Sequence, residues 1–258
     1  MNTIAIIIIA AIIFDFALNG LADYLNLSML RNDLPDAFRG VYDSDRYRKS
    51  QQYLKVNTRF GWNTATFDVA VILIFWFAKG FPLLDEWVRS FNFGPVITGL
   101  IYMAVLLVFK GVLSLPFSLY ATFVIEERFG FNQTTWTTFV MDLAKGLLLA
   151  VLLGAPLLAG ILAFFVHAGT NAWWYCWIAV TLYMLGVQFI APTWIMPLFN
   201  KFTPLEAGEL KSAILSYASS ISFPIENVYV MDGSRRSSKS NAFLPDLENI
   251  GASSCSTR

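Results

Sequence analysis

The stretch of sequence that decides the fold is residues 146–200, GLLLAVLLGAPLLAGILAFFVHAGTNAWWYCWIAVTLYMLGVQFIAPTWIMPLFN. These 55 consecutive residues contain no Asp, Glu, Lys or Arg. As a single helix they would extend about 82 Å, whereas the hydrocarbon core of a bilayer is about 30 Å thick. The stretch therefore has to cross a bilayer at least twice, and it predicts a polytopic membrane protein.

The composition of the whole chain supports the same class of protein. Of its 258 residues, 56% are hydrophobic and only 14% are charged, against about 25% charged residues in soluble proteins. This excludes a disordered chain and argues against an ordinary soluble domain. The 18 basic residues balance the 18 acidic ones, so no basic excess suggests a nucleic-acid partner. Two cysteines, Cys176 and Cys255, and the single histidine, His167, form no metal-binding pattern.

Five transmembrane helices are expected, near residues 1–22, 63–78, 94–125, 143–166 and 173–196. The first lacks the basic leading segment and the cleavage site of a signal peptide, so we interpret it as a span. Pro116 leaves two interpretations of the third: a long helix kinked at the proline, or one span followed by a short re-entrant piece. The expected fold class is an α-helical, polytopic membrane bundle of about five transmembrane helices.

Basic residues are distributed unequally among the segments that connect these spans. Residues 31–59 contain seven, Arg128 and Lys145 lie on the same side around the connection between the third and fourth spans, and residues 201–258 contain six. The opposite side has only Lys79 and Arg89. By the positive-inside rule the N-terminus is expected outside or in a lumen, and the C-terminus in the cytosol.

The composition becomes polar after residue 200, which predicts a short cytosolic helix–strand tail. Thr203 to Glu206 matches a capping box that would start a helix. The apolar face of that helix would contain Leu210, Ile214, Tyr217 and Ile221. Residues 228–231 are expected to form a short strand. A unit of this size buries too little apolar surface to be stable without a larger domain.

Four segments of the sequence resemble, in order, segments of one family of membrane enzymes. LPDAFRGVYDSDRYRKSQQYLKVNTRFG (residues 34–61) resembles the family's first cytosolic loop, and FVIEERFGFN (123–132) its loop after the third span. MPLFNKFTPLEAGELKSAI (196–214) resembles the junction with the peptidase domain. SFPIENVYVMDGSRRSSKSNAF (222–243) resembles its first strand and the Ser-Asn-Ala-aromatic segment.

The family that these segments resemble is the type I CAAX prenyl proteases. The resemblance implies an integral-membrane zinc metallopeptidase that removes the last three residues of a prenylated CAAX C-terminus. It further implies a ring of helices around an intramembrane chamber, capped by a zinc domain. The family's H-E-x-x-H motif, whose histidines bind zinc and whose Glu is the general base, does not occur in this sequence. From Leu244 the chain reads LPDLENIGASSCSTR instead. We therefore expect a chain truncated before that motif, with no catalytic residue, no metal ligand and no cofactor of its own.

The expected domains follow from this resemblance. Residues 1–200 would form the transmembrane domain, 201–243 the start of an incomplete cytosolic metallopeptidase domain, and 244–258 a divergent tail. Whether that tail is a frameshift or a natural end stays open.

Two groups of residues are candidates for functional sites. Asp15, Asp68 and Lys110 are charged and lie in or near apolar spans, where a charge is costly unless it serves a chamber or a partner. The alternative is that each lies at a membrane interface. Asn241, Ala242 and Phe243 match the strand that lines the family's substrate cleft.

The resulting functional expectation is the N-terminal membrane portion of a CAAX-processing zinc metalloendopeptidase, inactive as this chain alone. The alternative is a non-catalytic membrane module that binds lipidated peptides. The expected partners are the lipid bilayer, a prenylated or other lipidated peptide, and the missing C-terminal peptidase half. A bacterial cytoplasmic membrane and the endoplasmic reticulum both stay open as the location.

Overall fold

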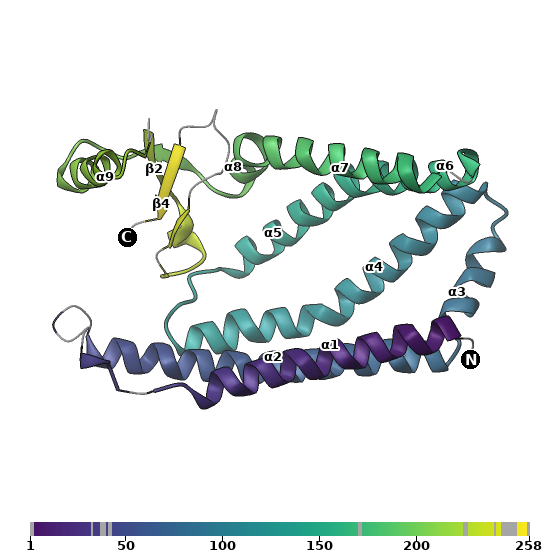
Figure 1. Ribbon diagram of the computed structural model, residues 1–258, viewed down its shortest axis with the longest axis horizontal. Helices are drawn as coiled ribbons and strands as arrows, with labels where there is room; N and C mark the ends of the chain where they lie inside the picture. Colours follow the sequence, from purple (N-terminus) through teal and green to yellow (C-terminus); the bar gives the residue numbers. More distant parts are fainter. Residues whose placement is uncertain are drawn as a thin grey trace. The chain divides into compact units, whose positions relative to one another are not determined.

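Five long apolar helical stretches dominate the structure (Figure 1), a computed structural model that describes residues 3–31, 33–36, 40, 43–169, 172–223, 227–239, 241–243 and 252–256. In those residues the stretches are Thr3–Ser28, Ser44–Phe77, Pro95–Glu126, Trp136–His167 and Ala172–Phe199. Each is long and apolar enough to cross a bilayer, which confirms the expected five-span α-helical class. Residues 1–93 with 101–129 form one compact unit, and residues 94–100 with 130–258 form a second.

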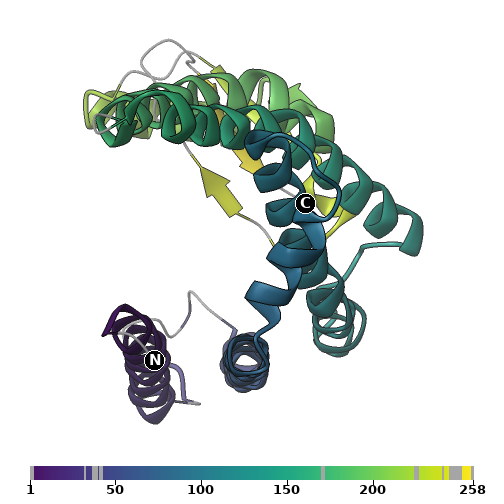
Figure 2. The same cartoon turned by 90° about the vertical axis from the view of Figure 1, so that its right-hand side faces the viewer.

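In the first unit, helix α1 (Thr3–Ser28) packs beside α2 (Ser44–Phe77). Figure 2 shows these two helices nearly end-on. The Asp43 carboxylate caps α2 by accepting a 2.8 Å hydrogen bond from the Arg46 amide. Helix α2 has 34 residues, or about 51 Å, and therefore extends well beyond the apolar part predicted at 63–78. Its N-terminal half carries five of the seven basic residues of the polar connection at 31–59, namely Arg46, Arg48, Lys49, Lys55 and Arg59.

A short helix, α3 (Gly80–Arg89), follows α2 and was not predicted. The chain turns at Lys79, which has a left-handed φ of 58°. A side chain at Gly80 would place its Cβ 2.5 Å from the Phe75 ring, so the turn requires glycine there. Phe81 then packs edge-on against Phe75, with ring centroids 4.8 Å apart.

The third span runs without a break through α4 (Pro95–Tyr120) and the π-helical segment η2 (Ala121–Glu126). Pro116 lies inside α4, which favours the long-helix interpretation over the re-entrant one.

The second unit contains two spans that also change to π-helical geometry. One consists of α5 (Trp136–Leu149), η3 (Ala150–Gly154) and α6 (Ala155–His167); the other of α7 (Ala172–Ile190), η5 (Ala191–Ile195) and α8 (Met196–Phe199). Pro156 and Pro197 each follow a π-helical segment, and the carbonyl four residues earlier, of Leu152 or Thr193, lies within that segment. Because proline has no N–H for that carbonyl and clashes with it, a wide turn relieves the helix at this point.

The tail forms a small sheet with strand order β1-β2-β4-β3, in which β3 (Asn241–Phe243) is an edge strand. Strand β1 (Phe202–Pro204) pairs antiparallel with β2 (Asn227–Met231), which confirms the strand expected at 228–231. Strand β4 (Ala252–Ser256) pairs parallel with β2 and antiparallel with β3. Helix α9 (Glu209–Ser220) lies between β1 and β2 in the sequence.

The predicted capping box at Thr203 is wrong. Thr203 lies in β1 opposite Val230, and the Leu205 amide donates a 2.8 Å hydrogen bond to the Val228 carbonyl. Strand pairing thus takes the backbone groups that a helix would have used, and the helix begins at Glu209 after Gly208.

Candidate functional site

A cavity of about 810 Å³ lies between α1 and α2 and contains most of the polar groups of α1. Asp15, Asn19 and Asp23 recur every four residues and so share one face of α1, which lines this cavity. From α2, the Trp62 Nε1–H donates a 3.1 Å hydrogen bond to the Asp23 carboxylate. The predicted candidate Asp15 thus lines this cavity together with other polar residues of an otherwise apolar span.

Asp68 and Lys110, 42 residues apart in the sequence, form an ion pair between α2 and α4. Asp68 also lines the α1–α2 cavity, and both members of the pair border a second cavity of about 470 Å³. The other walls of that cavity are apolar, among them Ile72, Phe75 and Phe109. Pairing explains how two opposite charges are tolerated in neighbouring spans.

Removing one partner of this pair is expected to destabilise the first unit. Lys110→Met leaves Asp68 unpaired and should lower the free energy of unfolding in lipid nanodiscs by about 1 kcal/mol. The exchanged pair, Asp68→Lys with Lys110→Asp, should recover most of that loss. Thermal unfolding of the two variants measures the loss and its recovery. An exchanged pair less stable than Lys110→Met would contradict the pairing.

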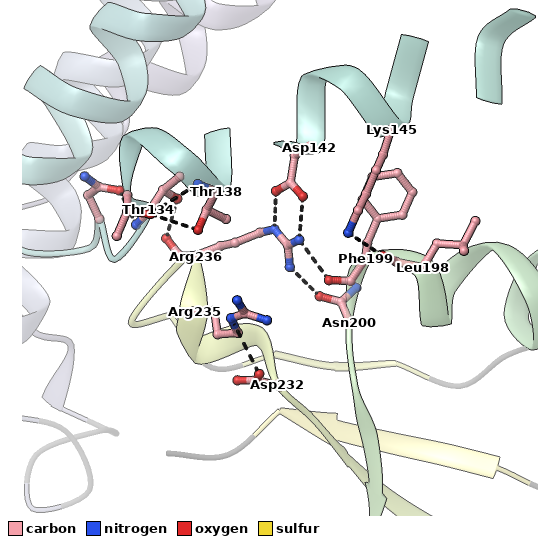
Figure 3. A network of polar contacts seen from close by, with 12 residues as sticks. Thr134, Thr138, Asp142, Lys145, Leu198, Phe199, Asn200, Asp232, Arg235 and Arg236 are labelled. Carbon is pink, nitrogen blue, oxygen red and sulfur yellow. Dashed lines mark hydrogen bonds and ion pairs between the residues drawn. The ribbon is translucent and has the colours of Figure 1, made fainter. Parts of the chain in front are cut away.

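Arg236 forms a polar anchor that fastens the tail to two spans of the second unit (Figure 3). Its Nε donates to Asp142 Oδ2 at 2.6 Å and one terminal nitrogen to Asp142 Oδ1 at 2.8 Å, a bidentate pair with α5. The terminal nitrogens also donate to the Phe199 carbonyl at 2.8 Å and to Asn200 Oδ1 at 2.7 Å. Hydrogen bonding to Asp142 raises the pKa of Arg236, so the cation persists at every physiological pH.

The backbone after Arg236 docks on the loop that precedes α5. The Arg236 carbonyl accepts hydrogen bonds from the Gln133 amide at 3.0 Å and from Thr134 Oγ1 at 3.1 Å. Ser238 donates to the carbonyls of Phe131 and Gly130, at 2.9 and 2.8 Å. Residues 236–239 are therefore held along the loop, and the edge strand β3 begins two residues later.

The predicted cleft residues Asn241, Ala242 and Phe243 form the whole of β3. Their partners in β4 are Ser256, Cys255 and Ser254. The other edge of β3 has no strand beside it within the described part of the chain. The tail thus presents this segment as an extended backbone at the edge of the sheet.

Sequence reasoning did not find the Arg236 anchor. Arg235 and Arg236 are adjacent, and nothing in the sequence distinguishes the one that binds Asp142, 94 residues away.

No zinc site of the family type can be built from the described residues. They contain no group of three or more His, Cys, Asp and Glu side chains placed to hold a metal ion. His167 ends α6, with Nδ1 2.9 Å from the Ala163 carbonyl, and Cys176 lies within α7. The donor set of the residues that the structure describes does not fit zinc.

These features define a multi-pass integral membrane protein with five spans and a short helix–strand tail. Residues 23–201 match the family described as CAAX prenyl protease N-terminal, five membrane helices. The chain belongs to this family.

Named relatives and a solved structure agree with this assignment. The chain is 38% identical over 232 residues to the probable CAAX prenyl protease 1 of Schizosaccharomyces pombe, covering 85% of this chain and 49% of the relative. It is 34% identical over 219 residues to the CAAX prenyl protease 1 homolog of Homo sapiens, covering 82% and 46%. The crystal structure of S. mikatae Ste24p matches with a TM-score of 0.82 and 32% identity, over 97% of this chain and 59% of that one. The chain spans about half the length of the curated relatives that it matches.

Proposed function

We propose that this chain forms the N-terminal membrane portion of a CAAX-processing zinc metalloendopeptidase. In this proposal the complete enzyme removes the terminal tripeptide of a prenylated protein. The observation that carries the proposal is the similarity to S. mikatae Ste24p, which extends over 97% of this chain and therefore includes the tail as well as the spans. The division at residues 200 and 243 into a membrane domain, an incomplete peptidase domain and a divergent tail belongs to the same proposal.

The proposed work of this chain is to bind and place the substrate. The cavity beside Asp68 and Lys110 has mostly apolar walls and suits a prenyl chain. Strand β3 is an edge strand, and an extended peptide can add to such an edge through main-chain hydrogen bonds. The Arg236 anchor holds the segment before β3 against spans of the second unit, so that the edge strand starts from a fixed point.

The zinc chemistry of the proposed enzyme belongs to an H-E-x-x-H motif, which these 258 residues do not contain. When bound, the zinc would activate the water that attacks the peptide bond. In this proposal both the metal ligands and the general base come from that motif and not from residues 1–258.

A second candidate function is a non-catalytic membrane module that binds lipidated peptides. The apolar cavity favours it, since it can hold a lipid chain without any chemistry. The test that separates the two uses a farnesylated CAAX peptide, with residues 1–258 alone and with the C-terminal part of a CAAX prenyl protease that carries H-E-x-x-H. Tripeptide release by the combination supports the protease portion, and peptide binding without release by the combination supports the module.

The proposed orientation places the N-terminus in a lumen and the C-terminus in the cytosol, in the membrane of the endoplasmic reticulum. The unequal basic residues support the orientation. Relatives in fungi, plants and animals support the organelle.

Reporter fusions test this orientation directly. Fusions after residues 55, 90, 170 and 215 should report cytosol, lumen, lumen and cytosol, because basic segments are retained in the cytosol. A lumenal signal from the fusion after residue 215 would contradict the proposed orientation.

A further inference from the structure

Helix α3, in the connection between the second and third spans, carries an exposed apolar stripe. Leu83, Trp87 and Phe91 follow one another at a spacing of four residues, so they lie on one side of α3 and of the turn after it. Their exposed fractions are 60%, 53% and 47%. The rings of Trp87 and Phe91 pack edge-on, with centroids 5.2 Å apart. These three side chains form one exposed surface, here called the α3 stripe.

A second side of α3 packs on the protein. Val88 is fully buried and Leu84 is half-buried. Phe81 contacts two rings at the end of α2, with centroids 4.8 Å from Phe75 and 5.7 Å from Trp76. This packing fixes the orientation of α3 on α2, and the α3 stripe therefore has a fixed direction as well.

The third side of α3 is polar. The Arg89 guanidinium pairs with the Asp85 carboxylate at 2.7 Å, and Glu86 is exposed. At 100° per residue these three residues occupy an arc that contains none of the stripe residues. Helix α3 thus has one side against protein, one charged side and one exposed apolar side, an arrangement typical of a helix at a boundary between lipid and water.

The place of α3 in the chain indicates which boundary this is. The helix lies between two apolar spans, Ser44–Phe77 and Pro95–Glu126. Gly80 follows Phe77 by three residues, which the chain can extend over at most about 11 Å. Figure 1 shows that α3 crosses the end of α2 at a large angle instead of continuing it. Because the headgroup layer is about 5–7 Å deep, α3 starts in or beside this layer and runs along it.

We infer that α3 is an interfacial helix whose stripe inserts into the lipid leaflet at this end of α2. Leu83 contacts the upper acyl chains, and the rings of Trp87 and Phe91 lie at the boundary between acyl chains and headgroups, where aromatic side chains are favoured. The partner of this surface is therefore the lipid interface, and the helix attaches the end of the second span to it.

The charges near the α3 stripe indicate which lipids it accepts. Lys79 and Arg89 balance Asp85 and Glu86, so the segment has no net charge to attract an anionic headgroup. Insertion should therefore proceed equally well in zwitterionic phosphatidylcholine and in bilayers with anionic lipid.

A depth measurement in bilayers tests the inference. A nitroxide is attached at Leu83→Cys or at Glu86→Cys in residues 1–258, with Cys176→Ala and Cys255→Ser removing the two native thiols. Collision rates with oxygen and with a water-soluble nickel chelate give the depth of the label in phosphatidylcholine vesicles, and nitroxide-labelled lipids of known depth calibrate the scale. We expect the label at position 83 about 5–10 Å below the phosphates, and the label at position 86 in water.

Two results would overturn the inference. Equal access of the nickel chelate to positions 83 and 86 would show that the α3 stripe faces water. Poor access of both oxygen and nickel to position 83 would show that protein covers the stripe, for example a second copy of this chain.

Amide exchange in lipid nanodiscs gives an independent test without a label. A ten-residue helix is marginal by itself in water, so protection of α3 depends on its contacts. Leu83→Ser should accelerate exchange of the amides of residues 84–90 about fivefold, because it removes apolar contact with lipid. Leu83→Phe should keep exchange within about twofold of the original chain.

Glu86→Ser is the matched control, since it introduces the same residue on the polar side of the same helix. It should change exchange by less than about twofold, and equal acceleration by Leu83→Ser and Glu86→Ser would contradict a lipid contact of the stripe. Neither test contains a peptide substrate or a peptidase part. Their failure would therefore leave the proposed protease function untouched.

Discussion

Purified residues 1–258 are expected to leave a farnesylated CAAX peptide uncut, and to support tripeptide release once the H-E-x-x-H part of a CAAX prenyl protease is added. A catalytic zinc site needs three protein ligands and an open position for water, and the described residues of this chain offer no such cluster. General base catalysis alone contributes about 10²–10⁴-fold, so the difference in rate should exceed about a hundredfold. Release of the tripeptide, followed by mass spectrometry, measures it.

Two controls keep this expectation falsifiable. Replacing the Glu of H-E-x-x-H in the added part by Gln should abolish release, while binding of the added part to residues 1–258 persists. Metal-dependent release by residues 1–258 alone would contradict the expectation.

Arg236→Met is expected to release the tail from the spans. The substitution keeps most of the side-chain stem but removes four hydrogen bonds and leaves the partly buried Asp142 carboxylate unpaired. We expect a loss of about 2–3 kcal/mol in the free energy that holds residues 236–239 on the loop. Amide exchange of Ser238, whose N–H is bonded to the Phe131 carbonyl, should therefore become at least about thirtyfold faster.

Arg235→Met is the matched control for this prediction. Arg235 is the neighbouring residue, but its side chain is 60% exposed and lies 3.9 Å from Asp232 within the same turn. Its loss should change Ser238 exchange by less than about threefold, because exposed ion pairs contribute little. Equal acceleration in the two variants would show that Arg236 is no anchor. Adding Asp142→Asn to Arg236→Met should recover part of the lost free energy of docking. An unpaired amide is less costly to bury than an unpaired carboxylate.

The spans were predictable because a charge-free stretch longer than a bilayer leaves few alternatives. Helix α3 was not predicted, because Lys79, Asp85, Glu86 and Arg89 give residues 79–89 the composition of a loop. A spacing of three and four between Phe81, Leu84 and Val88 was the signal that could have shown the helix. The residues around Thr203 match a helix start, but Thr203 pairs with Val230 of β2 instead. A short sequence pattern does not show that a distant segment competes for the same backbone groups.

The candidate site was less predictable than the fold. The cost of charge in a membrane identified Asp68 and Lys110 separately, but their pairing depends on how α2 and α4 pack. The Arg236 anchor depends on groups from α5, α8 and the residue after α8, which meet only once two spans and the tail are assembled. Contacts between segments so far apart have no signature in one sequence.

The π-helical segments before Pro156 and Pro197 also set the angular phase of their spans. A wide turn takes up about one residue more than an α-helical turn, so side chains beyond it are rotated relative to those before it. Residues of 136–167 that are spaced at 3.6 per turn therefore lie on different sides of the span before and after η3. Deleting a single residue within η3 would bring the two halves back into phase and turn α6 by about 100° against α7, with which it packs. A one-residue change in length at these positions would thus exchange which side chains face the neighbouring helix and which face lipid.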